Sequence, residues 1–367
     1  MPTKVRRPLI AAYFGLLAVI VFATQFAGTG FGGEGQHYSW VPSHALAIAS
    51  RATAVNGFVG HARSFLDADG APDYLYFDRY PFFFSALLGA LTSLTDDLAT
   101  KVWIARQLMH VMFVLTMLFA WLLLRSMGID ARLALVSTTL AFSGHMLLRY
   151  RELIHFDQPA LLGMMILLYV IARVKLEGRE RWRWLTVAAL LAVSLGRGFL
   201  SLGVLGLWAA VEAAGLLWQR ERPPAQRLQA ILRHDATRVL LLALAWSGLA
   251  LAYNVAHEMA RREVPFAETT IAQSIQYRLP GGKPTSDWQA DYNAFAVRME
   301  SRIKGWYSPL AEENSVALRD WVSLPLLLLV VYYHLRRQSP ARRIVFLLTA
   351  LSGLAWLFVM INLAWFH

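Results

Sequence analysis

The chain of 367 residues contains no cysteine, which excludes disulfides, a thiolate nucleophile and cysteine metal ligands. No Walker-type or dinucleotide-binding glycine pattern occurs, so transport driven by a nucleotide bound to this chain is disfavoured. Charged residues are also scarce, at 16% against 57% hydrophobic residues. A soluble domain of this length does not have that balance, and the composition predicts a polytopic membrane protein.

The formal net charge is +11, which in a soluble protein would suggest a nucleic-acid partner. Here the basic residues cluster in short segments between apolar runs, as membrane insertion requires. The basic segments therefore mark the cytoplasmic side, and we expect no nucleic-acid partner. Their simplest role is topology and contact with anionic lipids.

The apolar runs predict an all-α polytopic membrane protein of about nine helices. The first run is interpreted as an uncleaved anchor, with the N-terminus cytoplasmic and the C-terminus outside. We expect one transmembrane domain over residues 1–367. The predicted spans are residues 8–27, 102–124, 131–148, 159–174, 185–195, 199–218, 239–255, 321–333 and 344–365.

Two long polar segments, residues 28–101 and 257–320, form the first and second outer loops of this topology. Residues 81–94 are apolar but short, and the alternation of basic loops works only if they do not cross. They are predicted to form a juxtamembrane or re-entrant helix on the outer face. The same face receives the connector 149–157 and the turn 196–198, so chemistry is expected there.

Arg197 lies within an apolar stretch, where a charge costs several kcal/mol unless it is compensated. One interpretation is a functional charge inside the membrane. The other is a turn between two short spans at a water interface. In both cases the guanidinium is well placed to hold a lipid phosphate.

Other candidates lie in the first outer loop. Glu34 stands among glycines just after the first span, where a carboxylate can act as a general base or be a solvated loop acid. His37 and Tyr38 follow it as supporting residues. Asp78 and Arg79 precede the 81–94 helix, and Arg79 can grip an anionic head group, pair with Asp78 or snorkel.

The connector RYRELIHFD carries titratable groups between two spans and is too short to leave the bilayer surface. A divalent metal site from Glu152, His155 and Asp157 is one alternative, because oxygen and imidazole ligands suit several ions. Helical spacing would instead place Glu152 and His155 on one face and Asp157 on another. Ion pairing with neighbouring arginines is the other alternative.

Five short motifs occur in order within residues 33–203. They are GEGQHY with Glu34, FDRYPFFFSALLGAL with Asp78 and Arg79, WIARQLMHVMF with Arg106, RELIHFDQPALLGMM with Asp157, and SLGRGFLSLG with Arg197. Together they resemble the GT-C superfold glycosyltransferases, most closely the branch of protein O-mannosyltransferases and lipid A aminoarabinose transferase. Glu34 stands where that family has aspartate, and Arg197 where it has lysine.

The resemblance implies a GT-C-like bundle and an inverting transferase. Such an enzyme moves a sugar from a polyprenyl-phosphate carrier to an acceptor hydroxyl on a glycan, lipid or protein, at the outer face of a bacterial inner membrane. It implies that Glu34 is the base, that Asp157 orients it, and that Arg79, Arg106 and Arg197 neutralise the phosphate. A transporter or flippase, or a non-catalytic membrane subunit handling lipid-linked sugars, remains the alternative.

Overall fold

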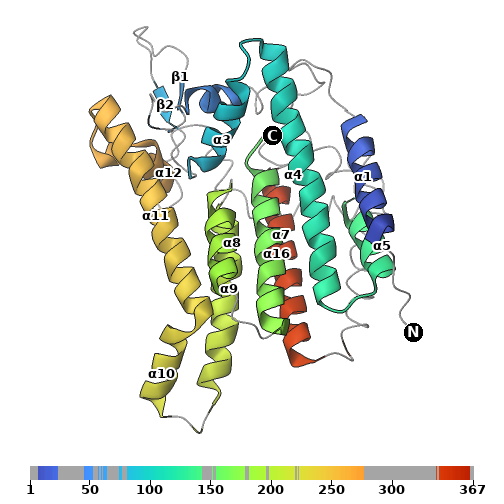
Figure 1. The fold of residues 1–367 in the computed structure, drawn as a ribbon. Helices are drawn as coiled ribbons and strands as arrows, with labels where there is room; N and C mark the ends of the chain where they lie inside the picture. Colours follow the sequence, from blue (N-terminus) through green and yellow to red (C-terminus); the bar gives the residue numbers. More distant parts are fainter. Residues whose placement is uncertain are drawn as a thin grey trace, which may run out of the picture.

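A computed structural model gives the arrangement of the chain (Figure 1). The structure describes residues 7–23, 45–52, 57, 59, 61–63, 74–76, 81–142, 151, 154–177, 182–195, 198–219, 221, 223–276, 336 and 339–363.

The described elements are almost all helical. The α-helices are α1 (Arg7–Ala23), α3 (Phe83–Thr92), α4 (Leu98–Ser126), α5 (Ala131–Phe142), α7 (Asp157–Glu177), α8 (Trp182–Ser194), α9 (Gly198–Leu217), α10 (Pro224–Arg233), α11 (Asp235–Arg262), α12 (Thr270–Gln276) and α16 (Pro340–Leu363). A 3-10 helix, η2 (Phe266–Glu268), precedes α12. Residues 45–51 are also helical.

These helices confirm the predicted class of an all-α polytopic membrane protein. Among the described residues, α4, α7, α9 and α11 are long and apolar enough to cross a bilayer. The shorter α1, α5 and α8 and the long α16 lie on four further predicted spans. The remaining predicted span, 321–333, lies outside the described residues.

Helix α4 shows why a span begins and ends where it does. Asp97 caps its start, because the carboxylate accepts the hydroxyl of Thr100 at 2.6 Å and its backbone N–H at 2.8 Å. These two hydrogen bonds lower the pKa of Asp97. Past its end, Gly128 has a left-handed φ of 84°, which reverses the chain into α5.

Helix α7 occupies the centre of the bundle, where it packs against α4, α8, α9 and α16 (Figure 1). Its side chains Leu167, Ile171 and Ala172 are fully buried in the main apolar core. At Gly163 the backbone of α8 comes so close that a Cβ would lie 2.9 Å from the Ala192 Cα. Small residues thus permit close helix packing, as is common in membrane proteins.

Ion pairs and close contacts hold the predicted cytoplasmic ends of several helices next to one another. Lys175 of α7 lies 2.5 Å from Glu212 of α9, and His234 at the start of α11 lies 3.8 Å from the same carboxylate. The guanidinium of Arg342, early in α16, lies against Gly128. The loops that the charge rule put on one side therefore meet at one end of the bundle.

The opposite end holds a second, smaller apolar cluster around α3. Phe84 and Leu88 of α3 pack there with Ala105 of α4 and with Ile154 and Phe156 of the connector. Helix α3 has ten residues, about 15 Å of rise, which is too short to cross a bilayer. A short apolar helix is therefore present within residues 81–94, as predicted.

Three features differ from the prediction. Strands β1 (His61–Arg63) and β2 (Tyr74–Tyr76) form an antiparallel ribbon in the first outer loop, where no strand was expected. Residues 224–233 form helix α10 where a plain loop was predicted. Helix α11 continues to Arg262, past the predicted boundary at 255, because hydropathy marks the apolar window rather than the last helical turn.

The close approach of α7 and α8 gives a first test. Replacing Gly163 with leucine should force these helices apart and lower the free energy of unfolding by about 1–3 kcal/mol. Thermal unfolding of the purified protein in detergent measures the change. Gly206→Leu is the control, because a Cβ at Gly206 meets nothing within 4 Å. Equal losses in the two variants would contradict the packing argument.

Candidate functional site

The candidate site lies at the end of the bundle that holds α3. Of the predicted site residues, Arg106, His155 and Asp157 are described by the structure. The others lie outside the described residues. These are Glu34, His37, Tyr38, Asp78, Arg79, Glu152 and Arg197.

Asp157 is the first residue of α7, and His155 precedes it by two positions. The Nδ1 atom of His155 lies 2.5 Å from Oδ2 of Asp157. Both side chains are largely buried, at 17% and 12% exposure respectively. The start of a helix favours a carboxylate, because unpaired backbone N–H groups and the helix dipole point toward it.

The expected separation of His155 from Asp157 is wrong. It assumed a helical connector, whereas residues 154–156 are not helical and α7 begins only at Asp157. A bend allows side chains two positions apart to meet. Among the described residues, no three histidine, aspartate or glutamate side chains gather into a metal site. Glu152, the third member of the predicted set, lies outside the described part.

Two buried arginines accompany this pair. Arg106 on α4 is 3% exposed, between Ala105 and Met109 of the smaller apolar cluster. Arg151 in the connector is 2% exposed. Arg151 was not among the predicted site residues, because the sequence of the connector does not reveal which of its side chains are buried. Buried guanidinium groups require anionic or polar partners, and they suit a phosphate.

A polar contact inside the bundle fixes the start of α7 against α4. Gln158 donates from Nε2 to Oγ1 of Thr116 at 3.1 Å, and Thr116 donates to the Met112 carbonyl at 2.6 Å. Both side chains are buried. The sequence did not predict this contact, because a single polar residue in a span does not reveal its partner. The contact orients the first turn of α7, and with it Asp157.

Aromatic rings of α3 contact both the connector before α7 and α11, and α11 in turn contacts α8. Phe84 lies edge-on to Phe156 with ring centres 5.4 Å apart. The neighbouring Phe83 stacks on Trp246 of α11, with centres 5.3 Å apart and planes inclined by 16°. The Trp246 indole N–H donates to Oγ of Ser194, at the end of α8, at 2.9 Å.

These contacts bring together residues that flank two predicted phosphate ligands. Phe83 follows Arg79 by four positions, and Ser194 precedes Arg197 by three. Trp246 touches both Phe83 and Ser194. Phe83, near Arg79 in sequence, and Ser194, near Arg197 in sequence, therefore both contact the Trp246 side chain.

Two parts of the predicted first outer loop also meet at Tyr253 of α11. Tyr253 donates its hydroxyl to the Gly57 carbonyl at 2.8 Å, and its ring lies 5.5 Å from that of Phe82. Gly57 has a φ of 62°, and a Cβ there would lie 2.7 Å from the Tyr253 oxygen. Position 57 therefore requires glycine.

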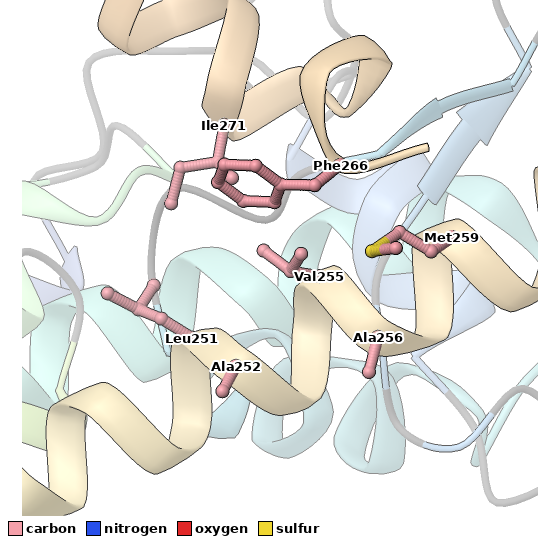
Figure 2. A pocket seen from close by; sticks show the side chains of 7 residues that line it. All are labelled: Leu251, Ala252, Val255, Ala256, Met259, Phe266 and Ile271. Carbon is pink, nitrogen blue, oxygen red and sulfur yellow. The ribbon is translucent and has the colours of Figure 1, made fainter. Parts of the chain in front are cut away.

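An apolar groove of about 400 Å³ lies along the other side of α11, under η2 and α12 (Figure 2). Its walls are Leu251, Ala252, Val255, Ala256, Met259, Phe266 and Ile271. The fully buried Glu258 of α11 attaches the start of α12 to α11, because its carboxylate accepts the Thr270 backbone N–H at 3.1 Å. The same carboxylate pairs with Arg262 at 2.5 Å. None of these seven side chains can act as an acid, a base or a nucleophile, so the groove is not chosen as the candidate site.

The fold and site define a multi-pass membrane protein with buried ionisable groups at one end of its bundle. Residues 92–260 match the family model of dolichyl-phosphate-mannose-protein mannosyltransferases. This match confirms the resemblance to GT-C glycosyltransferases of that branch, and it indicates a membrane glycosyltransferase that uses a lipid-linked sugar. It covers Arg106, Asp157 and Arg197. No curated protein and no solved structure matches the chain.

The hydrogen bond between Trp246 and Ser194 gives a second test. Trp246→Phe keeps a ring to stack on Phe83 but removes the indole N–H, and Ser194→Ala removes the acceptor. A double-mutant cycle on the free energy of unfolding should return a coupling of about 0.5–1.5 kcal/mol. Strictly additive effects would show that this contact does not join α8 to α11.

Proposed function

We propose that the protein transfers a sugar, with mannose the first candidate, from a polyprenyl-phosphate carrier to an acceptor hydroxyl at the outer face of a bacterial inner membrane. The observation that carries this proposal is the convergence at one end of the bundle. The buried His155–Asp157 pair, the buried arginines and the residues flanking Arg79 and Arg197 all lie there. The family match over residues 92–260 supplies the reaction class.

In this proposal the carboxylate of Glu34 takes the proton of the acceptor hydroxyl. The acceptor oxygen then forms a bond to the anomeric carbon of the sugar while the bond from that carbon to the phosphate oxygen breaks. A single displacement of this kind inverts the anomeric configuration. The electron pair leaves with the carrier phosphate, which Arg79, Arg106 and Arg197 neutralise as its charge develops.

Asp157 takes the role of an orienting acid. Its carboxylate is held from one side by His155 and by the start of α7, whose register against α4 is set by Gln158 and Thr116. A group anchored in this way can hold a neighbouring base or arginine in a fixed position. His37, Tyr38, Asp78 and Glu152 are proposed as supporting residues of the same site. A divalent ion bound by Glu152, His155 and Asp157 remains a proposal to be tested by chelation.

No observation favours the transporter alternative. Among the described residues, the buried charged side chains are Arg106, Arg151, Asp157 and Glu258. The main core of the bundle around α7 is formed by an apolar cluster whose members run from Val21 to Leu348. The described part of the bundle therefore provides no charged path from one end to the other.

The decisive experiment offers a panel of radiolabelled polyprenyl-phosphate sugars, with a membrane extract as acceptor, to purified wild-type protein and to Glu34→Gln. Loss of the general base should lower kcat by about 10²–10⁴-fold while the variant folds normally. Glu268→Gln is the matched control, because this exposed glutamate lies in η2 and should leave transfer unchanged. Equal transfer by wild type and Glu34→Gln would overturn the assignment of the base.

The phosphate ligand is tested separately with Arg197→Ala. Removing a charged hydrogen-bond donor should weaken binding of the lipid phosphate by about 1.5–3 kcal/mol. Equilibrium binding of the labelled carrier phosphate measures this loss without turnover. Binding that depends on Arg197, without transfer from any donor, would favour the transporter or subunit alternative.

The orienting role of Asp157 predicts a different pattern. Asp157→Asn keeps the size of the side chain but removes its charge, and kcat should fall on the order of 10²-fold with little change in KM. His155→Gln, which retains a hydrogen-bond donor near Oδ2, should lose less. An unchanged kcat in Asp157→Asn would exclude Asp157 from the mechanism.

A further inference from the structure

Helix α10 joins α9 to α11 at the end of the bundle opposite the β ribbon (Figure 1). Its sequence PAQRLQAILR places Leu228 and Leu232 one turn apart on one face. Both are more than half exposed, at 58% and 56%. Gln226 and Arg233 lie on the opposite face. The helix is therefore amphipathic, and its apolar face packs on no described element.

Both ends of α10 are attached to the bundle. Arg227 donates to the Leu217 carbonyl of α9 at 3.3 Å. At the other end His234 accepts the Ala236 N–H at 3.2 Å and lies 3.8 Å from Glu212 of α9. These contacts fix the rotation of α10 about its own axis, and so the direction in which the two leucines point.

The surroundings indicate what covers the apolar face. Helices α9 and α11 are both candidate spans, so the short link between them lies at a membrane boundary. Trp218, directly after the last residue of α9, is 81% exposed, as in the aromatic belt of membrane proteins. Residues 220–238 contain five arginines and two acidic residues. An apolar face with a basic surround fits an anionic lipid surface.

We propose that α10 is an interfacial anchor that inserts Leu228 and Leu232 into the bilayer surface, while the basic segment around it attracts anionic phospholipids. The inference goes beyond glycosyl transfer and is independent of it. It assigns a function to a segment at the end of the bundle opposite the candidate active site. The anchor would hold the α9–α11 junction at a fixed depth in the membrane.

The absence of cysteine makes a direct test straightforward. Single substitutions Leu228→Cys, Leu232→Cys and the matched opposite-face control Gln226→Cys are spin-labelled in the full chain and reconstituted into vesicles. Collision with oxygen and with a water-soluble nickel chelate reports the depth of each label. Labels at 228 and 232 should be several-fold less accessible to nickel than the label at 226. Equal nickel access at all three positions would overturn the proposal.

The lipid preference is tested by vesicle composition. Adding phosphatidylglycerol to phosphatidylcholine should deepen the labels at 228 and 232, and high salt should reverse that shift. Arg238→Gln, which removes an exposed arginine from the first turn of α11, should weaken the dependence on phosphatidylglycerol while transfer activity at the other end of the bundle is retained. Depth that is the same in both lipid compositions would overturn the assignment of an anionic partner.

Discussion

The central packing of α7 is the constraint on which the rest of the structure depends. This helix contacts α4, α8, α9 and α16, and the contact with α8 requires glycine at position 163. Because Asp157 is its first residue, the same packing that forms the core also fixes the position of a carboxylate at the end of the bundle. The hydrogen bond from Gln158 to Thr116 then sets the register of that end against α4.

Helix α3 extends this order from the core to the outer segments. It is too short to span a membrane, yet its rings contact the connector through Phe156 and α11 through Trp246. A chain segment in the first outer loop is thereby tied to a bundle helix more than 150 positions later in the sequence. Such long-range contacts can hold groups from separate loops in one reaction site, where small displacements carry large costs in rate.

The two ends of the bundle serve different physical requirements. Buried charged side chains gather at the end with α3, whereas the amphipathic helix α10 and its basic surround lie at the other end. The first arrangement suits a lipid phosphate and a reacting sugar, and the second suits the surface of a bilayer. In both cases the arginines have a role, but burial separates those of a site from those of a surface.

The sequence by itself determined the class and the positions of most spans, because hydrophobic length and the distribution of arginine and lysine act locally during insertion. It also marked His155, Asp157 and Arg106 through ordered motifs. Only the tertiary structure decided that His155 meets Asp157, that Arg151 is buried, that Gln158 pairs with Thr116 and that Trp246 links α3 to α8. These features depend on where a helix begins and on contacts between residues far apart in the chain, and periodicity along a single segment carries no information about either.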